Sequence, residues 1–299
     1  MIRYSFIIIL TLILLVFIGR DKPEFSDNLP KETLETAKLA QAGNPLAHYA
    51  IGHNYWSGQL GLKKDYRKAA YWLEKAYKAG VSEAGMELGV IYSTLHDYSV
   101  GSTPDIMRDK IYRGIRLLKE VFESDKLPDN LKAVPAQILA EVYAGRLGED
   151  NLTSLIIPTD LTEAASWLTK AAELGDIDAQ SDLGEAYLLQ LGVVEDVNKA
   201  LDLLTNTAKQ GNRQAQCYLY YMNWAGIKTP KDANKAQSWF FHESYTSKDD
   251  KDQEVSNHDH LCFRQATLLS LHANGDITTK EHYEFLDSHR TAISNTLAR

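Results

Sequence analysis

The chain has 299 residues, a formal net charge of −8 and 44% hydrophobic residues, which is an ordinary globular composition. Its charges are spread along the sequence, so it lacks the basic stripe that phosphate contacts need, and we expect no nucleic-acid partner. Its two cysteines, Cys217 and Cys262, are too few for a disulfide framework. They either form one bridge in an oxidising compartment or stay as two free thiols.

Residues 1–20 contain an apolar run from Phe6 to Ile18, preceded by Arg3. Such a terminus is typical of a signal anchor or a signal peptide and stands outside the fold. Bulky residues precede Gly19 where a signal peptidase needs small ones, which favours an uncleaved inner-membrane anchor with the remaining chain in the periplasm. The alternatives are cleavage with release to the periplasm or the medium and, less favoured, a buried core helix.

Residues 21–31 include two prolines, Pro23 and Pro30, and are expected to form a linker. The following segment, residues 32–43, predicts a helix that ends at Gly43. This helix resembles the second half of an incomplete unit. We therefore expect it to cap the N-terminal end of a stack.

One helical pattern recurs from residue 47 onwards, and its clearest copy covers residues 179–211. Counted from the first residue, the offsets 0, +4, +5 and +8 carry Ala179, Leu183, Gly184 and Tyr187, which share one side of a helix. A second amphipathic helix follows from residue 196. Because neither helix alone can bury its apolar stripe, the unit is stable only when stacked on neighbouring units.

The same offsets define five units in all, and the capping Asp160, Asp196 and Asp232 of the last three second helices are 36 residues apart. Insertions lengthen the second and third units at residues 93–107 and 148–159. The pattern stops after residue 244, so residues 245–299 are expected to form divergent C-terminal capping helices. The five units begin at Ala47, Ala84, Pro135, Ala179 and Ala215.

The repeated motifs resemble the Sel1-like repeat. The resemblance rests on A-x-x-x-[LI]-G-x-x-Y in the first helices and D-x-x-K-A-x-x-W-x-x-K-A in the second, as in Asp65, Lys68, Ala69, Trp72 and Lys75. It implies an all-α fold, a right-handed α/α superhelical solenoid with the first helices on its concave side. The solenoid is predicted to span residues 32–244. The second unit lacks the Trp and the capping Asp, and the fifth lacks the Leu-Gly pair.

The candidate binding residues lie at offsets +2, +6 and +9 of the first helices, away from the predicted packing stripe. Exposed aromatic rings there would supply contact energy for a protein or peptide partner. The alternative for the two tryptophans is that each fills the gap between the helices of its own unit. Two carboxylates on the same face complete the set, which comprises Tyr49, His53, Trp56, Glu141, Glu185, Tyr221 and Trp224.

The sequence offers little for catalysis. The pair His258 and His260 lacks further ligands at zinc spacing, so a solvated loop is favoured over a metal site. His242-Glu243 lacks the remainder of H-E-x-x-H, and no phosphate-binding or nucleophile-elbow motif occurs. We therefore predict no enzyme activity, no catalytic residues, no cofactor and no metal, with a glycan or peptidoglycan hydrolase as a minor alternative.

These observations predict a monomeric interaction protein of the bacterial cell envelope, attached to the membrane through its N-terminal segment. The resemblance implies adaptor or regulatory roles. It also leaves open an immunity protein that neutralises a secreted toxin, for example a type VI lipase effector. The nature of the partner, and whether it is an envelope protein or a toxin, does not follow from the sequence.

Overall fold

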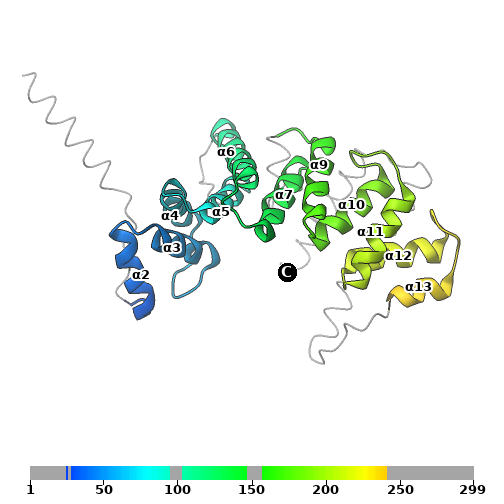
Figure 1. Ribbon diagram of the computed structural model, residues 1–299, viewed down its shortest axis with the longest axis horizontal. Coiled ribbons are helices and arrows are strands. Elements are labelled where there is room, and N and C mark those ends of the chain that lie inside the picture. Colours follow the sequence, from blue (N-terminus) through cyan, green and yellow to red (C-terminus); the bar gives the residue numbers. More distant parts are fainter. Residues whose placement is uncertain (1–24, 26–27, 95–102, 147–156, 241–299) are drawn as a thin grey trace, which may run out of the picture. The chain divides into compact units, whose positions relative to one another are not determined.

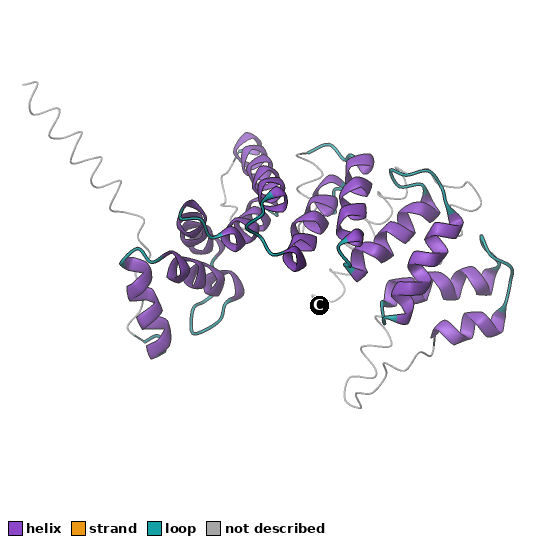
Figure 2. Ribbon diagram, viewed as in Figure 1, coloured by secondary structure: helices purple, strands orange, loops and turns teal. Residues whose placement is uncertain are grey.

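The computed structural model describes residues 25, 28–94, 103–146 and 157–240, and every element in these ranges is a helix (Figures 1 and 2). The chain divides into two compact units, Met1–Leu88 and Gly89–Arg299. The boundary falls inside α5 (Ser82–Ser93). The two units are described separately below.

The first compact unit holds the N-terminal capping helix and the first repeat. The capping helix begins one residue earlier than the sequence indicates, after Pro30. Helix α4 follows the side-chain cap of Asp65, which accepts hydrogen bonds from the backbone N–H groups of Arg67 and Lys68. The helices of this unit are α2 (Lys31–Gln41), α3 (Pro45–Ser57), α4 (Tyr66–Lys78) and the first part of α5.

The second compact unit continues the array to residue 240. Two of its helices begin earlier than the sequence pattern indicates, because Thr103 caps α6 in place of the missing Asp and because α7 accommodates Pro135 in its interior. Its helices are the rest of α5, then α6 (Pro104–Glu123), α7 (Asp129–Tyr143), α9 (Leu161–Glu173), α10 (Ile177–Leu189), α11 (Val197–Lys209), α12 (Arg213–Ala225) and α13 (Ala233–Phe240).

Within each unit the helices pack mainly on their neighbours in sequence, for example α3 on α4, α7 on α9, and α10 on α11. This nearest-neighbour packing is the property of a solenoid. We call the first helix of each repeat helix A (α3, α5, α7, α10, α12) and the second helix B (α4, α6, α9, α11, α13). The predicted all-α solenoid fold is confirmed.

A repeated hydrogen bond joins each of three helices A to the helix that precedes it. The side chain at offset +1 donates to a backbone carbonyl eight residues earlier, in the last turn of that helix. His48 Nε2 lies 2.8 Å from the Ala40 oxygen, while Gln180 and Gln216 reach Ala172 and Ala208 at 3.0 Å each. Carbonyls at a helix end lack partners within the helix, so this bond satisfies one of them and fixes the next repeat in place.

The small residue at offset +5 allows helices A and B to approach closely. A Cβ on Gly52 would come within 2.8 Å of Leu73, and one on Gly184 within 2.9 Å of Leu204. In the second repeat helix B has Gly114 where the first repeat has Ala69. A Cβ on Gly114 would lie 2.6 Å from the Ser93 nitrogen, so the two helices approach closely enough to exclude even alanine there. The predicted structural role of these residues is confirmed.

The aromatic ring at offset +8 packs against a cation in four repeats. Lys68 lies over Tyr55, Arg113 over Tyr92 and Lys199 over Tyr187, each cation coming from helix B of the same repeat. The third repeat has an acidic residue, Glu163, at that helix B position, and Lys119 of the preceding helix B covers its Tyr143 instead. Lys119 Nζ also donates to Glu163 at 3.1 Å.

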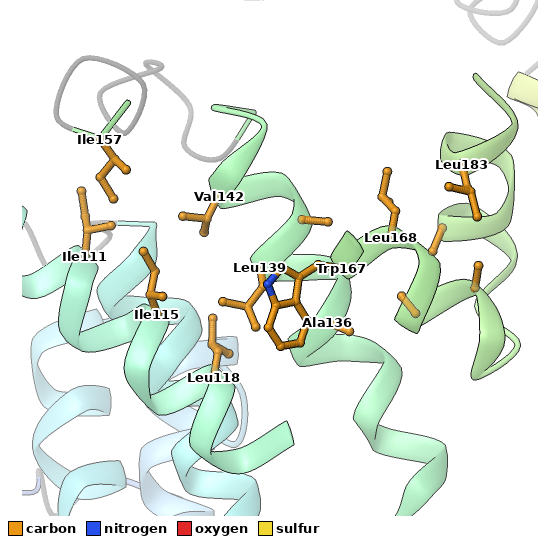
Figure 3. Close-up of a cluster of buried hydrophobic side chains, with 14 of the residues drawn as sticks. Ile111, Ile115, Leu118, Ala136, Leu139, Val142, Ile157, Trp167, Leu168 and Leu183 are labelled. Atoms are coloured by element: carbon orange, nitrogen blue, oxygen red, sulfur yellow. The ribbon is translucent and has the colours of Figure 1, made fainter. Parts of the chain in front are cut away.

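One apolar cluster of the second unit includes the helix B tryptophan of the third repeat, and a separate cluster lies between α10, α11 and α12. Figure 3 shows Trp167 beside Leu139, between side chains of α6 and α7. The ring is 3% exposed, and Phe122 packs edge-on against it with a ring separation of 5.2 Å. Its indole N–H donates to Glu163.

Phe25 makes a corresponding contact in the first unit. Its ring stacks on Trp72 at 5.9 Å and on Tyr55 at 6.4 Å. A residue from the predicted linker thus covers the ring of Trp72, as Phe122 covers that of Trp167 in the third repeat. Residues 1–20 and 245–299, which hold the predicted anchor and the predicted capping helices, lie outside the described residues.

Candidate functional site

The residues predicted for partner binding fall into three groups along the helices A. Tyr49, His53 and Trp56 lie on α3, and Tyr221 and Trp224 lie on α12. Glu141 on α7 and Glu185 on α10 belong to the third group. The first group is in the first compact unit, and the other two are in the second.

The α3 group is organised by a buried carboxylate of α5. The Tyr49 hydroxyl donates to Glu87 Oε1 at 2.9 Å, and His53 Nδ1 lies 2.8 Å from the same oxygen. A carboxylate only accepts, so His53 carries its proton on Nδ1. Glu87 is 4% exposed, and its buried Oε2 has no hydrogen-bond partner within the described part of the chain.

The electrostatics of this group reflect the burial of Glu87. Burial raises the pKa of the Glu87 carboxyl above its ordinary value, although the hydrogen bond from His53 opposes the shift. Burial and the nearby Glu87 charge also raise the pKa of the Tyr49 hydroxyl. The ring of Trp56 packs next to that of His53, at 5.7 Å between ring centres. The half-exposed rings of Tyr49, His53 and Trp56 thus form a row beside the buried carboxyl of Glu87.

The α12 group is the more exposed of the two aromatic groups. Trp224 leaves 49% of its surface accessible and packs on Tyr221 at a ring separation of 5.5 Å. The residue at offset +2, Cys217, is only 1% exposed. It takes part in a disulfide, and the only other cysteine of the sequence, Cys262, lies outside the described residues.

The third group surrounds a recess between α7, α9 and α10. Its walls are mainly alanine and leucine side chains, and Glu141, Arg146 and Asp182 supply its polar lining. Arg146 reaches Asp182 at 3.6 Å and Glu185 at 3.9 Å. The expected exposure of Glu185 was wrong: it is 4% exposed, because α12 packs beside it and Gln214 donates to its Oε2 at 2.7 Å.

Within this group, the carboxyl of Asp182 has a raised pKa. This pKa is raised to about 6, mainly by burial; the charge of Arg146 opposes this rise, and the charge of Glu185 adds to it. Gln214 donates to Asp182 Oδ1 at 2.9 Å as well as to Glu185. One amide and one guanidinium therefore serve two buried carboxylates.

A single register rule connects the first and third groups. Offset +6 of one helix A faces offset +3 of the next, which brings His53 to Glu87 in the first unit and places Glu141 and Asp182 around one recess in the second. Between the second and third repeats the same offsets hold Val90 and Ile138, which pack against the apolar core.

Sequence analysis missed Glu87, Arg146, Asp182 and Gln214. Offset +3 borders the packing stripe, so a residue there is normally read as structural. The sequence did contain one indication: offset +3 carries an acidic residue in both the second and the fourth repeat, although this offset borders the packing stripe. Arg146 follows α7 in the turn leading to an insertion, where periodicity carries no information.

The described side chains are suited to recognition. No group of three or more His, Cys, Asp or Glu residues there is placed to hold a metal ion, and no helix within the same ranges is long and apolar enough to cross a membrane. The predicted loop at His258 and His260 lies outside them. What these ranges present is aromatic surface and an acidic recess.

Comparisons with known proteins agree with this architecture. The family model described as Sel1 repeat matches residues 45–81, 145–176, 177–212 and 213–241. It passes over the second repeat, which lacks the consensus Trp and the capping Asp, and over α7, which has Ala140 in place of the consensus glycine. The structure continues the helix pairs through both. None of the curated proteins matches the chain.

The first of three similar solved structures supports the fold. A Sel1 repeat protein from Oxalobacter formigenes is 21% identical with a TM-score of 0.53, over 79% of this chain and 87% of that one. A protective antigen of uropathogenic Escherichia coli with an SLR fold is 19% identical with a TM-score of 0.43, over 86% of this chain and 55% of that one. A Sel1 repeat protein from Klebsiella pneumoniae is 19% identical with a TM-score of 0.38, over 80% and 99%.

Proposed function

The chain is a Sel1 repeat protein, and from that premise we propose that it binds a partner protein through the exposed faces of its helices A. Sel1 repeat proteins generally mediate protein–protein interactions, and the fold is typically a non-catalytic scaffold. The observation that carries the proposal is the exposed Trp224, with the half-buried Tyr221 packed beside it. Tryptophan and tyrosine are enriched among the residues that dominate binding energy.

The location we propose is the cell envelope, with the repeats outside the cytoplasm. Two observations support it: the apolar run Phe6–Ile18 and the disulfide of Cys217, since disulfides persist in oxidising compartments. If residues 1–20 stay in the membrane, the five peptide units from Arg20 to Phe25 span at most about 18 Å in any conformation. Phe25 contacts Trp72, so the first repeat would lie near the bilayer surface.

The test of binding is affinity capture with the full chain, solubilised from membranes in detergent. Trp224→Ala should reduce recovery of the captured partner at least tenfold while leaving the thermal unfolding temperature unchanged. The matched control is Val194→Ala, which truncates an apolar side chain that is 87% exposed in a turn. Equal recovery by the Trp224 variant and the wild type would contradict the proposal.

The identity of the captured protein separates the remaining possibilities. A resident envelope protein would indicate an adaptor, whereas the product of an adjacent toxin gene, bound one to one and neutralised in the periplasm, would indicate an immunity protein. Location is tested separately by alkaline carbonate extraction of membranes. A retained anchor keeps the chain in the pellet, and a cleaved signal peptide releases it.

A further inference from the structure

We propose that the solvent-exposed side of α4 in the first repeat contacts the headgroups of anionic phospholipids at the membrane surface. The inference rests on the proposed location, in which residues 1–20 stay in the membrane, and it adds a second contact with the bilayer. All the residues involved belong to the first compact unit. We call this surface the basic face, and it comprises Lys63, Lys64, Arg67, Lys75 and Lys78.

The charge of this segment is an exception among the helices B. Residues 63–78 contain six basic and two acidic residues. The corresponding residues around α9, 158–173, contain one basic and three acidic residues, and those around α11, 194–209, contain two and three. Since α9 and α11 form the same helix with the same aspartate cap, the repeat fold does not require the excess of positive charge.

The first three cations of the basic face are available for a contact. Lys63, Lys64 and Arg67 are exposed, and their equivalents around α9 and α11 are uncharged or acidic. None of the three forms an ion pair with a residue in the described ranges. The carboxylate beside them in sequence, Asp65, caps α4 and lies 3.7 Å from Lys68.

The helix presents its charge on the side opposite its packing. At 100° per residue, Arg67, Lys75 and Lys78 lie within about 80° of one another around α4. The buried residues of α4 occupy the other side, where α4 packs on α3; they are Ala69, Ala70, Trp72, Leu73 and Ala76. The basic face therefore stays open while the helix A of the same repeat is free to bind a protein.

The predicted linker lies against α4 and the turn before it. The ring of Phe25 stacks on Trp72 at 5.9 Å, and Lys75 Nζ lies 5.3 Å from the centre of the same indole ring. Pro30 packs against the turn that carries the first two lysines, since a Cβ on Gly61 would come within 2.7 Å of its Cδ. The chain that leaves the proposed anchor is thus attached to α4 at two places.

This attachment brings the basic face within reach of the bilayer. With Arg20 at the membrane surface, Phe25 lies at most about 18 Å from it. An anionic membrane strengthens the binding of a basic segment by about fivefold for each lysine or arginine, over a distance of about 10 Å. Residues 20–27 contain two basic and three acidic residues, so the linker itself does not supply this attraction.

Anionic lipid is the occupant that the tether favours. Because the anchor holds the first repeat at the bilayer, lipid headgroups are present at a high effective concentration, whereas an acidic protein must be bound from solution. The even spread of charge that argues against a nucleic-acid partner holds for the whole sequence and not for this segment. A location outside the cytoplasm separates the basic face from nucleic acid.

The test uses the full chain reconstituted in lipid nanodiscs. One set contains phosphatidylcholine alone, and the other contains two parts phosphatidylcholine and one part phosphatidylglycerol. Both include a trace of phospholipid with a photoreactive diazirine in its headgroup, and peptide mass spectrometry measures labelling of residues 58–78. Labelling should be several-fold higher in the anionic discs, and molar salt, which shortens the screening length to about 3 Å, should remove the difference.

Two double variants decide whether the basic face is responsible. Lys64→Gln with Arg67→Gln should bring labelling in anionic discs close to that in neutral discs. The matched control is Lys31→Gln with Lys38→Gln, which removes two exposed cations of α2 in the same compact unit and should keep most of the difference. Equal labelling of the wild type in both discs, or an equal loss in the two double variants, would overturn the inference.

The outcomes also separate this inference from the proposals on which it rests. A chain that stays in the discs but shows no lipid dependence rejects the basic face and leaves the anchor. A chain cleaved after residue 20 that still sediments with phosphatidylglycerol vesicles, and loses this binding in the Lys64 and Arg67 variant, rejects the anchor and supports the basic face. Partner capture lost in that variant while lipid labelling persists would assign the face to an acidic protein and overturn the inference.

Discussion

The junction between the first and second repeats and the junction between the third and fourth use the same register with different chemistry. Offset +6 faces offset +3 in both. In the first junction Glu87 accepts hydrogen bonds from Tyr49 and His53. In the second, Glu141 and Asp182 flank a recess, and Arg146 is recruited from the turn after α7.

The difference shows that the repeat geometry brings two positions together without deciding their charge. Where donors face the carboxylate, it is part of the packing. Where a second carboxylate faces it, the groups that contact the carboxylates come from outside the two facing positions, and Arg146 and Gln214 supply them. The following predictions test this contrast, in order of decreasing effect.

The largest effect is expected at Gly192, whose turn packs on the start of α9 next to the recess. A Cβ there would lie 1.9 Å from the Leu161 carbonyl oxygen, and its φ is +75°. Gly192→Ala should therefore lower the free energy of unfolding by about 3 kcal/mol or more, measured by urea titration with far-UV circular dichroism.

Gly211→Ala is the matched control for backbone conformation. Its φ is +90°, but nothing lies within 4 Å of the added Cβ, so only the left-handed conformation is penalised, by about 1 kcal/mol. Similar losses in the two variants would mean that the turn moves away from α9 without cost.

Glu87→Ala should destabilise the first junction by about 2 kcal/mol, because Tyr49 and His53 both lose their buried acceptor. Glu87→Gln keeps a carbonyl oxygen at the same place and should cost less than half as much. Urea titration of the full chain compares them. If the two variants are equally unstable, volume and not hydrogen bonding holds this junction.

Asp182→Asn should have the opposite sign. The carboxyl pKa is 3.8 ordinarily and about 6 in the folded chain, so between these values the folded chain binds more protons and its stability falls as pH rises. Removing the charge should stabilise the chain by roughly 2 kcal/mol at pH 7.5 and by almost nothing at pH 3.5. A loss at pH 7.5 would show that Arg146 satisfies Asp182 fully.

The repeat pattern made the fold predictable, because period, small residues and aromatic offsets all serve contacts within one helix pair. Gly52 against Leu73 and Lys68 against Tyr55 follow from such local spacing. The second repeat was also predicted, despite its missing Trp and Asp, because its helix A motif survives. Its helix B begins earlier than expected since Thr103 caps it.

The candidate site was less predictable because it depends on contacts between repeats. Glu141 and Glu185 were recognised one at a time, but their relation depends on Arg146 from a turn and Gln214 from the next helix A. No periodicity specifies those partners. The contact of Lys119 with Tyr143 was not predictable for the same reason. The cation comes from the preceding repeat, so the sequence of the third repeat alone does not indicate it.

The smallest effect is expected where the fourth repeat departs from the turn of its neighbours. Gly58 and Gly226 end α3 and α12 in the left-handed conformation, while α10 ends there with Gln190 at φ 56°. A non-glycine residue pays a steric penalty in this region. Gln190→Gly should raise the free energy of unfolding by about 0.5–1 kcal/mol, since the exposed contact of Gln190 with Glu195 is long, at 3.4 Å. Gln210→Gly, at a helix end with φ −85°, is the control and should not stabilise; a gain in that variant as well would trace the effect to something other than the left-handed backbone.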